Sequence, residues 1–132
     1  KIKFEEFSLP GILHLKEQGI EFIENGTLVK AGKLNIIHGN EIHAGGLINV
    51  ARTKLIRAFD NVLFGHHHFK DERTERKLGG DTIGAWAVGC LCGLRPDYYK
   101  FNNWVHGFAT VETFNGGEFH VENKQMINYK IL

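Results

Sequence analysis

Three consecutive histidines follow an apolar run and a glycine in the segment 61–69, NVLFGHHHF. A chain that needed only a turn there would use Gly, Asn, Asp or Pro, because these residues supply the backbone angles or local hydrogen bonds of turns. Imidazoles add nothing to a turn. Their nitrogen atoms are neutral near pH 7 and suit transition metals. The pattern therefore predicts a metal site at the end of a buried strand.

A second apolar run, KLNIIHG at 33–39, also ends in a histidine, His38. The intervening segment 47–59 carries its apolar residues on one helical stripe, which predicts a helix. Strand, helix and strand form a parallel crossover, and ligands bind at the carboxyl ends of parallel strands. We therefore expect His38, His66 and His68 to meet at one sheet edge as metal ligands. An extended backbone after Gly65 would point His66 and His68 one way and His67 the other.

Other residues near these motifs could orient the ligands or line a substrate groove: Asn40, Glu41, His67, Asp71, Trp104 and His106. The segment 95–100, RPDYYK, mixes cations with tyrosines, which suit nucleotides or phosphorylated ligands. Core packing explains these aromatic residues equally well, and a solvated loop charge explains Glu41 and Asp71. No residue of the chain is assigned a catalytic role from its sequence.

The remaining elements surround this crossover. Ser8, Pro10 and Gly19 frame a helix over 9–18, and the Asn25-Gly26 turn predicts a hairpin of strands 20–24 and 27–30. The second half of the chain lacks helical spacing, and we expect strands at 74–78, 82–92, 105–114 and 118–129, the last two joined by a turn at 115–117. These elements predict an α/β (α+β) domain.

Composition restricts the class of protein. The 132 residues suit a single domain, and a net charge of +1 gives no general attraction for nucleic acid or anionic membranes. No apolar stretch approaches the roughly 20 residues of a membrane helix. Cys90 and Cys92 lie in an apolar run where alternation would point them the same way. We interpret them as reduced core thiols of a cytoplasmic protein, neither a disulfide nor a zinc pair.

The blocks IIHGN (36–40) and FGHHH (64–68) resemble the last two signature blocks of the calcineurin-like metallophosphoesterases, a His-Gly pair and a Gly-His-x-His motif that each end a strand. The helix at 45–59 and the segment 102–112, NNWVHGFATVE, look like the smaller phage and bacterial members. The resemblance implies the C-terminal half of a two-sheet β-sandwich flanked by helices. It also implies that His38 and His66 bind one metal ion and His68 the other.

The same resemblance implies a metal-dependent phosphoester hydrolase, in which hydroxide activated by two metal ions attacks phosphorus. The ions would be manganese, iron, zinc or nickel, and the substrate a phosphorylated small molecule or nucleic acid. The family's first three blocks, an Asp-x-His, a Gly-Asp-x-x-Asp and a Gly-Asn-His-Asp or Gly-Asn-His-Glu, have no match in residues 1–132, and the chain opens on Lys1 without a methionine. We therefore expect one domain over 1–132, the C-terminal portion of a metallophosphoesterase domain. Alone, it should bind metal weakly and hydrolyse little.

Two other classes of function fit the same residues. One is a binding or assembly module that docks on a separate chain carrying the first three blocks, or on a second copy. The other is a structural zinc domain, in which His38, His66, His68 and a fourth ligand close a tetrahedron with no open position.

Overall fold

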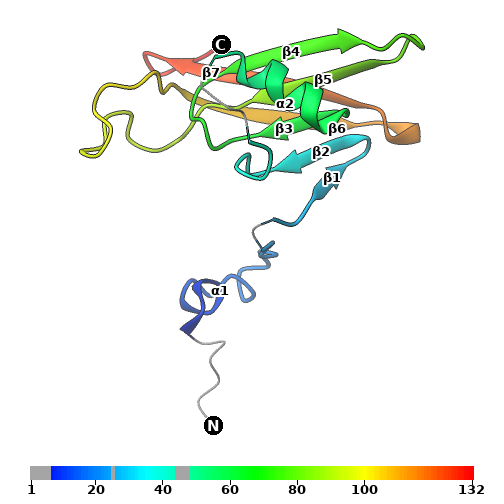
Figure 1. Ribbon diagram of the computed structural model, residues 1–132. Coiled ribbons are helices and arrows are strands. Elements are labelled where there is room, and N and C mark those ends of the chain that lie inside the picture. Colours follow the sequence, from blue (N-terminus) through cyan, green and yellow to red (C-terminus); the bar gives the residue numbers. More distant parts are fainter. Residues whose placement is uncertain (1–6, 25, 44–47) are drawn as a thin grey trace.

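A computed structural model describes residues 7–24, 26–43 and 48–132, and it has a mixed α+β architecture with two sheets (Figure 1). One sheet has the order β1-β2-β3-β5-β4, with the bounds Val29–Ala31 (β1), Leu34–Ile37 (β2), Val62–Phe64 (β3), Thr82–Ala87 (β5) and Asp71–Arg76 (β4). The other has the order β6-β7-β8, with the bounds His106–Thr113, Phe119–Ile127 and Lys130–Ile131. The helices are α1 (Leu9–Ile12), α2 (Val50–Ala58) and the short 3₁₀ turn η2 (Asn115–Gly117). The α+β class is confirmed.

The crossover predicted between 33 and 65 is present. Strand β2 pairs with β3 in parallel, α2 connects them, and β3 pairs in parallel with β5. Ile37, Phe64 and Ala87 lie opposite one another, each as the last residue of its strand. Because the three parallel strands end in one row, the residues that follow them lie along one edge of the sheet.

Helix α2 and the three-stranded sheet lie against different faces of strand β5. Ala85 and Ala87 are fully buried in the core cluster that α2 supplies with Val50 and Leu55, and their small side chains let the helix approach the sheet. Trp86 alternates to the other face, where its ring meets Phe119 of β7 edge to face at 5.8 Å. The five-stranded sheet is therefore the middle layer between α2 and the second sheet (Figure 1).

The N-terminal part of the chain differs from our expectation. The helix is α1 alone, and turns over 13–19 replace the rest of the predicted 9–18 helix. Residues 20–24 form no strand, and Asn25 of the predicted turn lies outside the described residues. The hairpin instead joins β1 to β2 through Gly32-Lys33, with glycine first and at φ +60°, the preference of a type II′ turn. Long-range contact supports this turn, since Lys33 N–H donates to Gly117 O at 2.7 Å.

The other predicted elements are present with shifted ends. Helix α2 occupies the later part of the predicted 47–59 segment. Leu47 lies outside the described residues. Phe59 lies beyond the helix end and is 75% exposed. Strand β4 begins three residues earlier than predicted and β5 ends at Ala87, not at Cys92. Beyond β5, Cys90 forms an isolated bridge with His106, which ties the two sheets together. This bridge replaces the predicted continuation of the strand.

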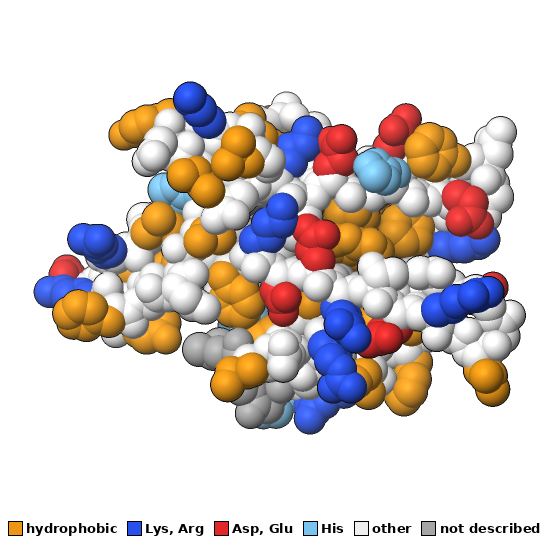
Figure 2. Space-filling view, turned by 90° about the horizontal axis from the view of Figure 1, so that it is seen from above, with side chains coloured by type: hydrophobic (Ala, Val, Ile, Leu, Met, Phe, Trp, Pro, Cys, Tyr) orange, Lys and Arg blue, Asp and Glu red, His pale blue; other side chains and the backbone are white. Residues whose placement is uncertain are grey.

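The described helices include none long and apolar enough to cross a membrane. On the face drawn in Figure 2, basic and acidic side chains are interspersed, and apolar side chains lie between them. Among the residues coloured there, this face carries no broad field of one sign such as tracks a nucleic-acid backbone.

Gly89 provides a test of the junction between the sheets. A Cβ atom at Gly89 would lie 2.7 Å from both Gly107 N and Val105 O, which are backbone atoms that cannot move independently. We expect Gly89→Ala to lower the free energy of unfolding by about 1–3 kcal/mol, measured by urea denaturation. Gly93→Ala is the control, because a Cβ there meets nothing within 4 Å. Equal stability of the two variants would contradict the close approach of the sheets.

Candidate metal centre

The ends of β2 and β3 bring His38 and His66 into contact, although the two are far apart in sequence. Gly65 N–H donates to His38 O at 2.9 Å, so the backbones remain paired one residue beyond the strands. His38 Nε2 lies 3.1 Å from His66 Nδ1, and the rings meet at 70°. Two nitrogens that each bind one ion at about 2.0–2.1 Å are roughly 2.9–3.4 Å apart for octahedral to tetrahedral bond angles. The observed separation suits two ligands of one metal ion.

The electrostatic surroundings favour the neutral imidazole of His66. Partial desolvation of the ring lowers the pKa of His66, and repulsion from His38, Lys54 and His68 lowers it further. A neutral imidazole is the form that binds a metal ion. Both side chains are exposed, and His38 with Glu41 lines a hollow of about 390 Å³ beside residues 23–24 and 26–27. The pair is therefore open to solution.

Glu41 and Lys54 hold the turn that carries His38. The Glu41 carboxylate accepts the backbone N–H groups of His38 at 3.2 Å and Gly39 at 2.6 Å. Burial works to raise the pKa of Glu41, but these backbone hydrogen bonds and the charge of His38 outweigh it and lower that pKa. From α2, fully buried Lys54 donates to Gly39 O and Ile42 O. Sequence reasoning placed Glu41 near the imidazoles, and the structure shows that it binds the backbone beneath them.

The histidine triplet is not extended as we predicted. His66 and His68 both have left-handed backbone angles, with φ of +66° and +60°. Such residues cost of order 1–3 kcal/mol each and persist where surrounding contacts enforce them. His67 N–H donates to Gly65 O at 2.7 Å, which tightens the turn. The directions of the His66 and His68 side chains are therefore set by their left-handed backbone conformations and not by the alternation of an extended strand.

His67 belongs to the packing of the turn. Its ring meets Phe64 edge to face at 6.0 Å and Phe69 at 5.8 Å. Burial, followed by repulsion from Lys54, His66 and His68, lowers the pKa of His67 to about 4. Its buried Nε2 has no hydrogen-bond partner among the described residues. His67 therefore holds the turn through the packing of its neutral ring against Phe64 and Phe69.

His68 faces two cysteines. Donor atoms of His68, Cys90 and Cys92 all lie within 4.8 Å of one another, and His68 Nδ1 is 3.9 Å from Cys92 Sγ. Among the described residues, these are the three potential metal ligands whose donor atoms lie this close together. The group includes neither His38 nor His66. The prediction that both cysteines are core thiols is wrong for Cys92, which is exposed, because β5 ends before it. The signal that sequence reasoning missed is that the cysteines follow the third parallel strand.

Trp104 and His106 frame this second group. The Trp104 ring packs against His68 at 4.2 Å, edge to face, and His106 Nε2 lies 3.0 Å from Cys92 O. Burial raises the pKa of the Cys90 thiol, and its hydrogen bond and repulsion with Cys92 raise it further. Both predicted neighbours therefore lie beside the His68 group and not beside the His38–His66 pair.

The remaining predicted neighbours lie elsewhere. Asp71 accepts the Ala51 N–H at 2.9 Å and so caps the start of α2 from strand β4. Asn40 is exposed on the turn after His38.

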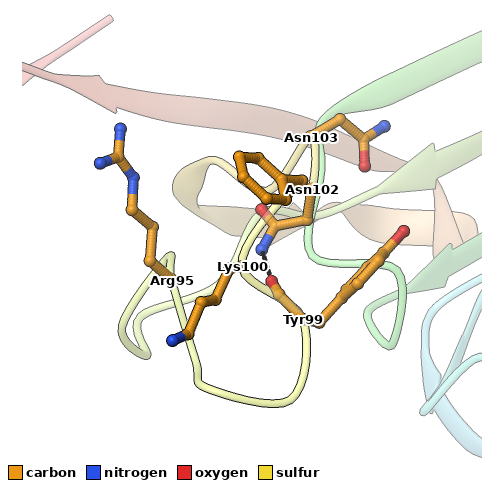
Figure 3. A pocket seen from close by; sticks show the side chains of 6 residues that line it. Arg95, Tyr99, Lys100, Asn102 and Asn103 are labelled. Atoms are coloured by element: carbon orange, nitrogen blue, oxygen red, sulfur yellow. Dashed lines mark hydrogen bonds between the residues drawn. The ribbon is translucent and has the colours of Figure 1, made fainter.

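A pocket of about 730 Å³ opens next to Trp104. Its lining comes from one loop: Arg95, Tyr99, Lys100, Phe101, Asn102 and Asn103. Figure 3 shows Arg95 and Lys100 on one side of the pocket and the Tyr99 ring on the other. Asn102 Nδ2 holds the loop by donating to Tyr99 O at 2.6 Å and Leu94 O at 2.8 Å. The Tyr99 ring lies 5.9 Å from Trp104, which connects the pocket with His68.

Comparisons of this chain with models of known protein families, with curated proteins and with solved structures found no match.

Lys54 offers a test of how the His38 turn is held. Replacing Lys54 by Met keeps its volume but leaves the Gly39 and Ile42 carbonyls without this donor. We expect Lys54→Met to lower the free energy of unfolding by about 1–3 kcal/mol, measured by urea denaturation. Arg52→Met, an exposed position on the same helix, should change it by less than about 0.5 kcal/mol. A Lys54→Met variant as stable as Arg52→Met would show that the amine does not support the turn.

Proposed function

We propose that this chain is the C-terminal part of a metal-dependent phosphoester hydrolase of the calcineurin-like type. The observation that carries the proposal is the 3.1 Å separation of His38 Nε2 and His66 Nδ1 at the ends of two parallel strands. The two blocks that resemble the family, IIHGN and FGHHH, supply these residues. Their separation agrees with the shared metal ion that the resemblance implies.

A simple hydrogen bond between the two rings is the competing explanation for this contact. A hydrogen bond between two rings can form without an unusual backbone conformation. His66, however, has a left-handed conformation that non-glycine residues rarely adopt. Glu41, Lys54 and His67 all support the turns that carry the pair. Strained ligands held by a rigid surround are typical of functional sites.

The side chains of the site have separable tasks. His38 and His66 would hold one ion and His68 the other. The contact between His38 and His66 supports the first assignment, whereas His68 lies with Cys90 and Cys92. Bound divalent ions at such sites activate water and stabilise charge that develops on phosphoryl oxygens. Glu41 and Lys54 fix the His38 turn, and His67 fixes the His66 turn.

The pocket beside Trp104 supports a phosphorylated substrate that carries an aromatic ring. Arg95 and Lys100 offer cations for a phosphate, and Tyr99 offers a ring face for stacking. An exposed ion pair between Lys100 and Asp97 at 3.4 Å is weak and does not withhold the amine. Nucleotides and nucleic acid ends combine these two features.

The structural zinc alternative receives less support. It places His38, His66 and His68 around one ion, whereas the close donor group in the described residues joins His68 to the cysteines. The two exposed histidines also leave room for further ligands, as catalytic sites do.

Metal titration of the purified chain tests the proposal. We expect manganese and zinc to bind, and His38→Ala or His66→Ala to weaken binding at this site by roughly 100-fold or more, because loss of outer-shell partners alone costs 10–100-fold. Calorimetry measures the binding, and hydrolysis of bis-p-nitrophenyl phosphate is followed in parallel. His120→Ala, an exposed histidine on β7, is the control. The chain alone should show little turnover.

Unchanged manganese binding in both the His38→Ala and the His66→Ala variants would overturn the site. Turnover that appears after addition of a chain carrying the first three blocks, and that disappears with His38→Ala, would support the hydrolase. Turnover insensitive to His38→Ala would contradict it.

A further inference from the structure

We propose that His68, Cys90 and Cys92 form a thiolate metal site that is selective for zinc over manganese. The site shares no ligand with the His38–His66 pair, and it includes His68, which the family resemblance assigns to a second metal ion. The inference does not depend on phosphoester hydrolysis. It rests on donor geometry, on the backbone that holds His68 beside Cys90 and on the exposure of Cys92.

The donor distances suit a tetrahedral ion. A zinc ion with bonds of about 2.3 Å to sulfur and 2.0–2.1 Å to nitrogen separates its S and N ligands by roughly 3.6 Å and two S ligands by roughly 3.8 Å. His68 Nδ1 and Cys92 Sγ are 3.9 Å apart, and all three donor atoms lie within 4.8 Å. Shifts of up to about 1 Å would bring the three donors to bonding distance.

Backbone hydrogen bonds hold His68 beside Cys90 without a metal ion. Val105 N–H donates to His68 O at 2.8 Å, and Val105 O accepts Cys90 N–H at 2.9 Å. Gly107 N–H in turn donates to Cys90 O at 3.1 Å. The His68 turn and Cys90 therefore both pair with the segment that leads into β6, and Trp104 in that segment packs against the His68 ring.

The exposure of Cys92 leaves a fourth coordination position of the ion open to solvent. Cys90 is nearly buried with 9% exposure, whereas Cys92 lies at the surface. Three protein ligands with an accessible side are typical of sites that bind water or substrate as the fourth ligand.

The donor chemistry sets the metal preference. Thiolates are soft ligands that select zinc, whereas manganese prefers carboxylate, carbonyl and water oxygen. The His38–His66 pair contains only nitrogen donors and discriminates less. Two ions bound by this chain would therefore differ in identity, with zinc at the cysteines.

Cobalt substitution under reducing conditions tests the site in the full chain. One equivalent of Co²⁺ should give thiolate-to-cobalt charge-transfer absorption and intense tetrahedral visible bands. Cys92→Ser should remove the charge-transfer signal of that ligand and weaken zinc binding at this site at least 100-fold, with little effect on folding because Cys92 is exposed. Cys90→Ser and His68→Ala should act in the same direction, with folding checked by circular dichroism.

Two controls separate this site from the proposed hydrolase. His38→Ala should keep the thiolate bands in full while it disrupts the other pair, and His120→Ala should keep both. Manganese should fail to displace the cobalt, and zinc should displace it. Absence of charge-transfer absorption in the reduced wild-type chain, or undiminished absorption in both serine variants, would overturn the inference whatever the result of the hydrolysis assay.

Discussion

The in-register parallel pairing of β2, β3 and β5 is the constraint on which the rest of the structure depends. Because Ile37, Phe64 and Ala87 lie in one row, the chain leaves three strands at the same edge of the sheet. The hydrogen bonds from Gly65 to His38 O and from Val88 to Phe64 O extend that order beyond the strands. Distant segments thereby place their donor atoms within a few ångströms of one another.

Local sequence patterns predicted the elements whose structure depends on neighbouring residues, namely the strands and the helix of the crossover. The apolar runs before His38 and Gly65, with a helical stripe between them, identified β2, α2, β3 and the meeting of their ends. The Asn25-Gly26 turn was misleading, because contact of Gly32-Lys33 with Gly117, 85 residues away from Gly32 in the sequence, supports a hairpin at another place. Local turn preference carries no information about such long-range contact.

The cysteines show the same limit. Alternation of apolar residues continues through Cys92, so sequence alone extends β5 to that point. The strand ends at Ala87 because the chain then pairs with the second sheet through Cys90 and His106, at the close approach of Gly89 and Gly107. That change of partner turns two expected core thiols into neighbours of His68. The left-handed backbone of His66 and His68 was equally invisible, since it arises from contacts around the turn.

Anomalous X-ray diffraction from crystals of the chain grown with manganese would test the central claim most directly. We predict a manganese peak within bonding distance of both His38 Nε2 and His66 Nδ1, with the two nitrogens still about 3.1 Å apart. A map in which these two rings remain hydrogen-bonded to each other, with manganese bound elsewhere or absent at saturating concentration, would contradict the claim that the strand ends form a metal centre.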